Sequence, residues 1–200
     1  ETIECSINVN NQQYSTLFYL SFGKDDSGFD QYKNVFSYLR GTSFNFKIPT
    51  GLPREFSARI NNTNSDINSG WSYGNFKVYP DIMNELTVNT APSQITPEDG
   101  VKDVDNRMRF SFNSGTGNGV YIISLNNISR NYEYRIFTES NYFTLEGLED
   151  LGFGRINNNI FSWQVNKTGP VNSMNDFAVD FFNKENHYIL QSAHRIFSTK

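Results

Sequence analysis

The chain has 200 residues, a net charge of -4 and a sequence pI near 5.2, and its 17 Lys and Arg residues are scattered singly. This distribution excludes the clustered basic surface that phosphate backbones require, so nucleic acid is not expected as a partner. Aromatic residues make up 16% of the chain, which supplies enough bulky apolar surface for packed cores and excludes a disordered chain.

Hydropathy and the N-terminal residues bear on location. No apolar run approaches the roughly 20 residues that span a bilayer, and Glu1 to Glu4 lack the regions of a signal peptide. Cys5 is the only cysteine and follows no lipobox, so we expect a plain strand or core thiol. We expect a secreted or cell-envelope protein without a transmembrane segment, and a lipid anchor upstream of residue 1 stays open.

Apolar residues alternate with a period of two along most of the chain, which is the spacing of one sheet face. Asn-rich turns separate these segments at intervals of roughly 8–12 residues, as in sandwiches and barrels. The pattern predicts an all-β, antiparallel fold with strands at residues 17–22, 44–48, 56–60, 76–79, 86–88, 108–112, 120–125, 132–137, 160–165 and 195–198. Residues 30–39 also fit helical spacing after an Asp30 cap, and stay open between helix and strand.

A domain boundary is predicted at Thr90-Ala91-Pro92-Ser93-Gln94, where a β-rich run ends in a proline-punctuated stretch. Proline fixes φ and favours an extended residue before it, which suits a joint between domains. We expect two consecutive β-sandwich domains, residues 1–91 and 92–200, because a seven-stranded sandwich needs only about 100 residues.

The second half resembles a bacterial fibronectin type III-like module. The segments that carry this resemblance are Ile95-Thr96-Pro97-Glu98-Asp99-Gly100 at the start, Phe110-Ser111-Phe112 at strand B, Tyr134-Arg135-Ile136-Phe137 after the central hairpin, Tyr142-Phe143-Thr144-Leu145 at strand E, Phe161-Ser162-Trp163-Gln164-Val165 at strand F and His194-Arg195-Ile196-Phe197-Ser198-Thr199 at the closing strand. Residues 1–91 resemble the family less closely, and an immunoglobulin-like variant fits them as well. The departure is residues 168–191, which we expect as a long loop of the kind that is often functional.

Catalytic chemistry is not expected. Nucleophilic catalysis needs a nucleophile, a base within reach and a group that orients the base. The chain has only two histidines, His187 and His194, one thiol, and no G-x-S-x-G elbow. A zinc site would need three or four ligands, which two histidines do not provide without recruited carboxylates. We therefore expect a protein that is not an enzyme.

Calcium is the one cofactor that stays open, because hard cations prefer several loop oxygens. The acidic loops are Asp25, Asp26 and Asp30, and Asp99, Asp103 and Asp105. Neither loop has EF-hand spacing, and both also fit ordinary solvated turns. The Gly115-Thr116-Gly117-Asn118-Gly119 segment precedes a strand rather than a helix, so we expect a flexible hairpin loop and no phosphate cradle.

Trp71 and Tyr73, among Asn-rich turns, are the candidate ligand-binding residues, because exposed aromatic rings pack against the apolar faces of sugars. The alternative is that Trp71 packs on the core at a sandwich edge. Trp163 is expected in the core, since alternation buries Phe161, Trp163 and Val165 together.

These observations favour a non-enzymatic bacterial surface or envelope module that acts in adhesion, in interaction with protein or glycan, or as a spacer. The alternative is a carbohydrate-binding accessory region of a secreted glycan-processing or glycan-uptake system. Fold resemblance alone does not separate the two, because sandwiches serve many functions.

Overall fold

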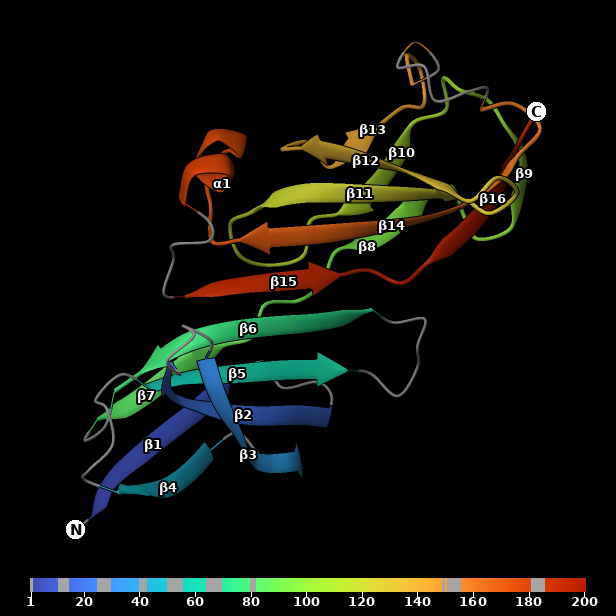
Figure 1. The fold of residues 1–200 in the computed structure, drawn as a ribbon. Coiled ribbons are helices and arrows are strands. Elements are labelled where there is room, and N and C mark those ends of the chain that lie inside the picture. The colour runs from blue at the N-terminus through green and yellow to red at the C-terminus, as the bar shows by residue number, and fades with distance from the viewer. Residues whose placement is uncertain are drawn as a thin grey trace.

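The computed structural model describes residues 2–10, 15–24, 30–39, 43–49, 56–63, 70–79, 82–148, 150, 156–180 and 186–200. In this part of the chain strands predominate and one short helix occurs, so the predicted all-β class is confirmed (Figure 1). Most strand pairs are antiparallel. The exceptions among the described strands are the parallel pairs β1–β7 and β9–β16.

The N-terminal half contains seven strands. They are β1 (Thr2–Asn10), β2 (Ser15–Lys24), β3 (Asp30–Leu39), β4 (Ser43–Pro49), β5 (Phe56–Thr63), β6 (Trp71–Val78) and β7 (Met83–Thr87). The order β4-β1-β7 forms one sheet, and β6-β5-β2-β3 forms part of another. Alternate residues of β1, namely Cys5, Ile7 and Val9, are fully buried, so the prediction of a core thiol at Cys5 is confirmed.

Residues 30–39, which stayed open between helix and strand, form strand β3. This strand pairs with β2 from Thr16↔Leu39 to Lys24↔Asp30, with register shifts along the way. A ten-residue helix is marginal in water without packing, whereas β3 satisfies backbone groups along the outer side of β2. Pairing along the neighbouring strand therefore overrides the helical spacing of the side chains.

The C-terminal half contains nine strands and one helix. They are β8 (Ser93–Thr96), β9 (Val101–Val104), β10 (Phe110–Asn113), β11 (Val120–Asn127), β12 (Tyr132–Thr138), β13 (Tyr142–Phe143), β14 (Ile160–Gly169), α1 (Met174–Asp180), β15 (His187–Gln191) and β16 (Arg195–Thr199). One layer is the sheet β13-β10-β8. The other is β12-β11-β14, where β14 pairs with β16 along its first part and with β15 along its last part.

The core of this half lies between its two sheets and is built on aromatic rings. Trp163 is fully buried and meets Phe110 edge-on at 5.3 Å between ring centroids. Phe161 stacks on Phe197 at 5.4 Å. Each such side chain contributes about 1.5–3 kcal/mol through burial, and edge-to-face pairs add to this. The predicted burial of Phe161, Trp163 and Val165 is confirmed.

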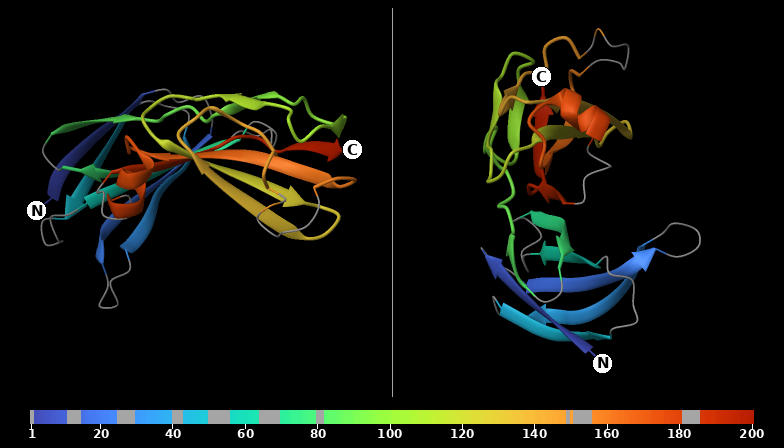
Figure 2. Two further views of the ribbon diagram at one scale, coloured as in Figure 1. Left: turned by 90° about the horizontal axis from the view of Figure 1, so that it is seen from above. Right: turned by 90° about the vertical axis from the view of Figure 1, so that its left-hand side faces the viewer.

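Residues 168–191, expected as a long loop, contain the end of β14, helix α1 and strand β15. Tyr188 and Leu190, at alternate positions of β15, point toward the interior of the protein and are 6% and 1% exposed. On its other side β15 pairs antiparallel with β6 of the N-terminal half, from His187↔Asn75 to Gln191↔Trp71. One sheet of ten strands therefore passes through both halves, and the two halves meet along β6 and β15 (Figures 1 and 2).

The glycine-rich segment 115–119, expected as a flexible hairpin loop, does not join a hairpin, because β10 and β11 belong to different sheets. Thr116 and Thr90, which lies in the stretch that joins the two halves, bond reciprocally: the Thr90 N–H donates to Thr116 Oγ1 at 2.8 Å, and the Thr116 N–H donates to Thr90 Oγ1 at 3.1 Å. The buried Lys167 ammonium donates to the carbonyls of Ser114, Thr116 and Gly117 at 3.0, 3.2 and 2.6 Å. Burial lowers the pKa of Lys167. These bonds hold the segment against the stretch that joins the two halves.

Gly115→Ala is expected to destabilise the protein more than Gly147→Ala. Both glycines have positive φ, which costs a residue with a Cβ about 1–2 kcal/mol. A Cβ at Gly115 also overlaps the Thr90 carbonyl, whereas one at Gly147 meets nothing within 4 Å. Urea unfolding of both variants measures the difference, for which we expect at least about 1 kcal/mol. Equal losses would contradict the close packing of this segment on Thr90.

Tyr188→Phe tests the contribution to stability of the Tyr188 hydroxyl on β15, which donates to the carbonyl of Asn118. Burial, with a smaller contribution from Tyr121, raises the pKa of Tyr188 from 10.0 to about 12. Because the folded pKa is the higher one, the stabilisation by this hydroxyl is complete below pH 10 and is lost as the pH rises toward 12. At pH 7 we expect the variant to be less stable by about 1 kcal/mol, and the gap to shrink above pH 10. A gap that stays constant across this range of unfolding measurements would overturn the assignment.

Candidate functional site

The outer face of the large sheet, opposite the core, brings polar residues of several strands side by side. Residues directly opposite each other in an antiparallel pair project to the same face. Gln191 lies opposite both Trp71 and Asn166, so β6, β15 and β14 present these three residues side by side. Asn166 in turn lies opposite Ile122 of β11, and Ile122 opposite Phe137 of β12.

A shallow trough of about 390 Å³ lies on this face across β12, β11, β14 and β15. Its lining is mostly amide and hydroxyl side chains. The residues that line it are Ile122, Ser124, Asn126, Glu133, Arg135, Gln164, Asn166, Thr168, Ile189 and Gln191. Amides carry both donors and acceptors, so this lining matches a ligand rich in hydroxyl groups.

The amides of the trough floor are held in place by hydrogen bonds. The side-chain nitrogen of Gln191 donates to Gln164 Oε1 at 2.7 Å, and Gln164 Nε2 donates to the carbonyl of Ser192 at 3.0 Å. The Ser192 hydroxyl in turn accepts the N–H of Val165 at 2.9 Å. The floor is therefore ordered before any ligand arrives, which reduces the entropic cost of binding.

The two charged residues of the trough form an ion pair on β12. Arg135 donates from Nε and Nη2 to the two carboxylate oxygens of Glu133, each at 3.1 Å. The hydrogen bond from Arg135 is the main reason that the pKa of Glu133 is lowered, and a hydrogen bond from Ser124 adds to it. The same pairing raises the pKa of Arg135.

Trp71 and Tyr73 lie two residues apart on β6 and share this outer face beside the trough. Trp71 is 37% exposed and Tyr73 is partly exposed, so Trp71 does not pack into the core as its alternative interpretation held. The Tyr73 ring lies 5.8 Å from the His187 ring, at 45°. The structure thus places both predicted residues next to Gln191 and the amide-lined floor.

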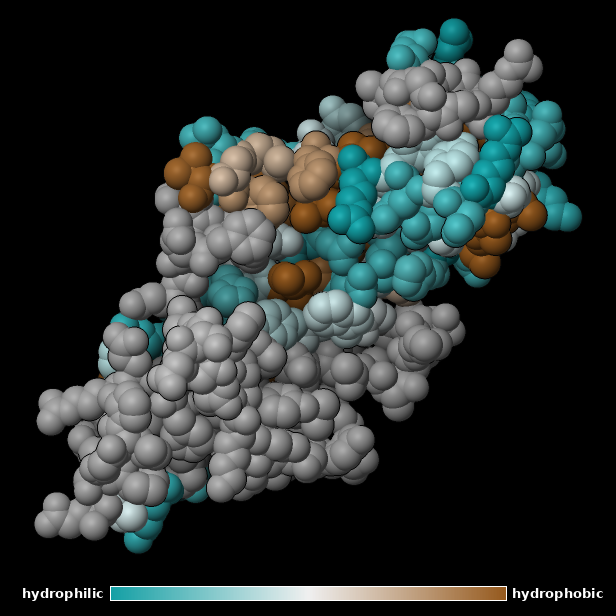
Figure 3. All heavy atoms as spheres, viewed as in Figure 1, coloured by the Kyte–Doolittle hydropathy of each residue, from teal (hydrophilic) through white to brown (hydrophobic). Residues whose placement is uncertain are grey.

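Helix α1 covers one end of the outer face. Val120, Val171, Met174, Phe177 and Ile189 form a small apolar cluster beneath it. In the view of this face, hydrophobic colours gather over α1 and hydrophilic colours over the strands beside it (Figure 3). The helix therefore bounds the trough, because Ile189 belongs to both the cluster and the trough lining.

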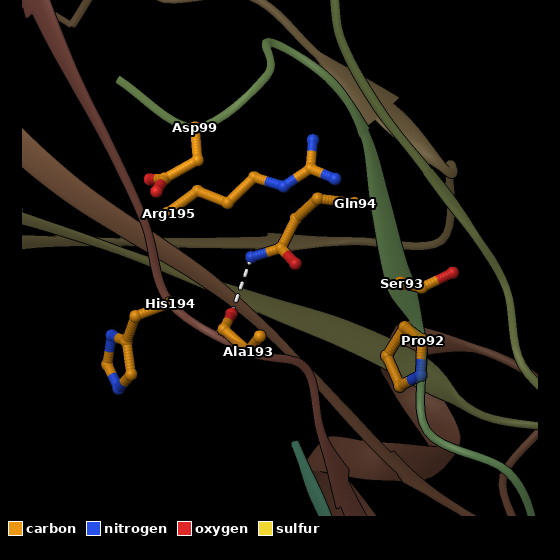
Figure 4. Close-up of a pocket in the computed structure, with 7 residues that line it drawn as sticks. All are labelled: Pro92, Ser93, Gln94, Asp99, Ala193, His194 and Arg195. Atoms are coloured by element: carbon orange, nitrogen blue, oxygen red, sulfur yellow. Dashed lines mark hydrogen bonds between the residues drawn. The ribbon is translucent and has the colours of Figure 1, made fainter. Parts of the chain in front are cut away.

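A second hollow, of about 290 Å³, lies where β8 meets the turn before β16 (Figure 4). Its polar groups are engaged within the protein. Arg195 donates to the carbonyls of Ile95 and Pro97 at 3.1 and 2.7 Å, and Asp99 accepts the N–H of Ile196 at 2.7 Å. Gln94 donates to the carbonyl of Ala193 at 2.6 Å. This arrangement ties β8 to β16, whereas the trough adjoins the candidate residues Trp71 and Tyr73 on β6.

The two histidines do not converge on one site. His187 lies on the outer face of β15 beside Tyr73, whereas His194 is exposed at the second hollow. Of the acidic loops, Asp25 and Asp26 lie outside the described residues, as does the side chain of Asp30, so the calcium prediction stays a prediction. Within the described ranges, no group of three His, Cys, Asp or Glu side chains is arranged to hold a metal ion.

Sequence reasoning singled out Trp71 and Tyr73 but missed the trough. The signal was present in β14, where the polar residues Gln164, Asn166 and Thr168 alternate with the apolar Trp163 and Val165. Such alternation marks the outward face of a strand but does not show which strands lie beside it. That information came only from the pairing of β15 with β6.

Comparison with known proteins adds no relative. No protein-family model matches the chain, and no curated protein matches it. No helix among the described residues has the length and apolarity to cross a membrane.

Proposed function

We propose that the chain is a non-enzymatic binding module of the bacterial cell surface or envelope, and that it binds an extended carbohydrate across its outer sheet face. One observation carries the proposal: the amide-lined trough continues into the exposed Trp71 ring and the partly exposed Tyr73 ring on the next strand. Aromatic rings offer flat apolar contact, and amides satisfy hydroxyl groups at the edges of a sugar ring.

The dimensions favour an oligosaccharide. From β12 to β6 the outer face spans four inter-strand spacings, which is about 19 Å at ~4.8 Å each. The chemistry along this span changes from the Glu133–Arg135 pair, through the amides of β14 and β15, to the rings on β6. A ligand that uses all of it must therefore be elongated and must present hydroxyl groups and apolar faces together.

The fold assignment that accompanies this function is a tandem of fibronectin type III-like or immunoglobulin-like modules, residues 1–91 and 92–200. In the second half, segments 110–112 and 142–143, compared above with strands B and E, share one sheet. Segments 161–165 and 195–199, compared with strand F and the closing strand, share the other. The buried cluster around Trp163 consists of residues of the second half alone, which also supports a separate second module.

A spacer or adhesive role is the second candidate, supported by the fixed joint between the halves. The β6–β15 ladder and the bonds between Thr90 and Thr116 restrain the two halves at more than one point. A restrained joint suits a module that presents a binding face at a set orientation. This role and carbohydrate binding are compatible within one chain.

Trp71→Ala is expected to lower affinity for the bound glycan by at least about tenfold, because stacking and apolar contact are worth about 1.4 kcal/mol or more. Trp71→Tyr keeps a flat ring and is expected to retain most binding. The matched control is Tyr142→Ala, which removes an exposed ring from β13 on the other sheet. Binding is measured on an oligosaccharide array and then by calorimetry. Equal affinity of the Trp71→Ala and Tyr142→Ala variants for every glycan bound by the parent would contradict the proposal.

Asn166→Leu tests the floor of the trough. Replacing this partly exposed amide by an apolar side chain of similar size removes hydrogen bonds to ligand without opening a cavity. We expect a five- to tenfold loss of glycan affinity with a change in unfolding free energy below about 1 kcal/mol. Unchanged affinity in calorimetry would place the ligand elsewhere on the molecule.

A further inference from the structure

We propose that the trough selects uncharged glycans, and that the Glu133–Arg135 pair is the feature that disfavours acidic ones. This inference rests on the proposed function and names its ligand class. The other residues that line the trough are amides, hydroxyls and isoleucines, so Glu133 and Arg135 are its only charged lining residues among those the structure describes. Their charges are opposite and sum to zero.

The geometry directs the positive charge of Arg135 toward Glu133. Both hydrogen bonds of the pair are 3.1 Å long and join the Nε and Nη2 groups to the two carboxylate oxygens. In this two-point arrangement the donor edge of the guanidinium is occupied by a carboxylate of its own chain. The same edge would otherwise be able to bind the uronate or sulfate group of a ligand. An acidic sugar entering here must displace Glu133 or lie next to its negative charge.

The position of the pair makes this effect local to the site. Glu133 lies opposite Asn126, and Arg135 lies opposite Ser124, both of which line the trough. The side chains are 32% and 65% exposed, so the pair stands at the rim in contact with solvent. Ion pairs this exposed to solvent contribute little to stability, so we expect that the pair can be changed without unfolding the chain.

The remaining lining fits a neutral ligand. The partly exposed side chains of Asn126 and Asn166 can both donate and accept hydrogen bonds, as sugar hydroxyls also do. Binding of this kind releases few counterions and should depend little on salt, in contrast to binding of a polyanion by free cations. Salt dependence therefore separates the two ligand classes.

The test compares the full chain with Glu133→Gln against two sets of probes: soluble neutral glucans, xylans and mannans, and the acidic polymers polygalacturonate and heparin. The parent is expected to bind at least one neutral probe, with less than a twofold change in affinity between 50 and 300 mM NaCl. Glu133→Gln frees Arg135 and is expected to gain at least about fivefold in affinity for an acidic probe at 50 mM NaCl, with the gain lost at 300 mM.

Two control variants match the charge changes. Glu85→Gln makes the same substitution on β7, where Glu85 accepts hydrogen bonds from Asn8, and is expected to leave both probe sets unaffected. The double variant Glu133→Gln/Arg135→Gln has an uncharged trough and, unlike Glu133→Gln alone, is expected to show no gain in affinity for acidic probes over the parent. Thermal unfolding confirms that each variant is folded.

The outcomes distinguish this inference from the proposed function. Preferential, salt-sensitive binding of an acidic probe by the parent would overturn the inference and leave carbohydrate binding in place. The absence of any gain in Glu133→Gln, with neutral binding intact, would remove the role of the pair. No binding of either probe set by the parent or by any variant would instead overturn carbohydrate binding itself.

Discussion

The antiparallel pairing of β15 with β6 is the interaction on which the arrangement of the molecule depends. It joins five residues of the C-terminal half to five of the N-terminal half, from His187↔Asn75 to Gln191↔Trp71. Unpaired edge strands expose backbone donors and acceptors, and each half covers the edge of the other through this ladder. The inward side chains Tyr188 and Leu190 are buried at the same place, so apolar burial and backbone pairing act together.

The continuous sheet separates two kinds of chemistry. Its inner face carries the aromatic core around Trp163, while its outer face carries the amides of the trough and the rings on β6. Strand β14 contributes to both faces, because Trp163 and Val165 point inward and Gln164 and Asn166 point outward. The proposed ligand face therefore exists only because strands from both halves pair within one sheet.

The sequence predicted ten of the strands and the burial of Trp163, because alternation with period two is a local property of a strand, but β1 and β9 were not among the predicted segments. It did not predict β15, since a five-residue strand within a long connection is recognised by its partners rather than by its own pattern. The Gly115–Gly119 segment was predicted as a flexible hairpin loop from composition, but it bonds to Thr90 and to Lys167, and such distant partners are not visible in the local sequence. Residue type alone identified Trp71 and Tyr73 as candidate ligand-binding residues. The amides that lie next to them could be identified only from the pairing of β6 with β15.

Amide hydrogen exchange across β6 and β15 in the full chain tests the shared sheet most directly. Backbone amides that are paired within a sheet exchange slowly, whereas those of an exposed edge exchange quickly. If one sheet passes through both halves, the hydrogen-bonded amides of Trp71–Val78 and His187–Gln191 are protected to a degree similar to those of Ile160–Gly169. Rapid exchange along the facing edges of β6 and β15, with β14 still protected, would show two separate sheets and contradict the account.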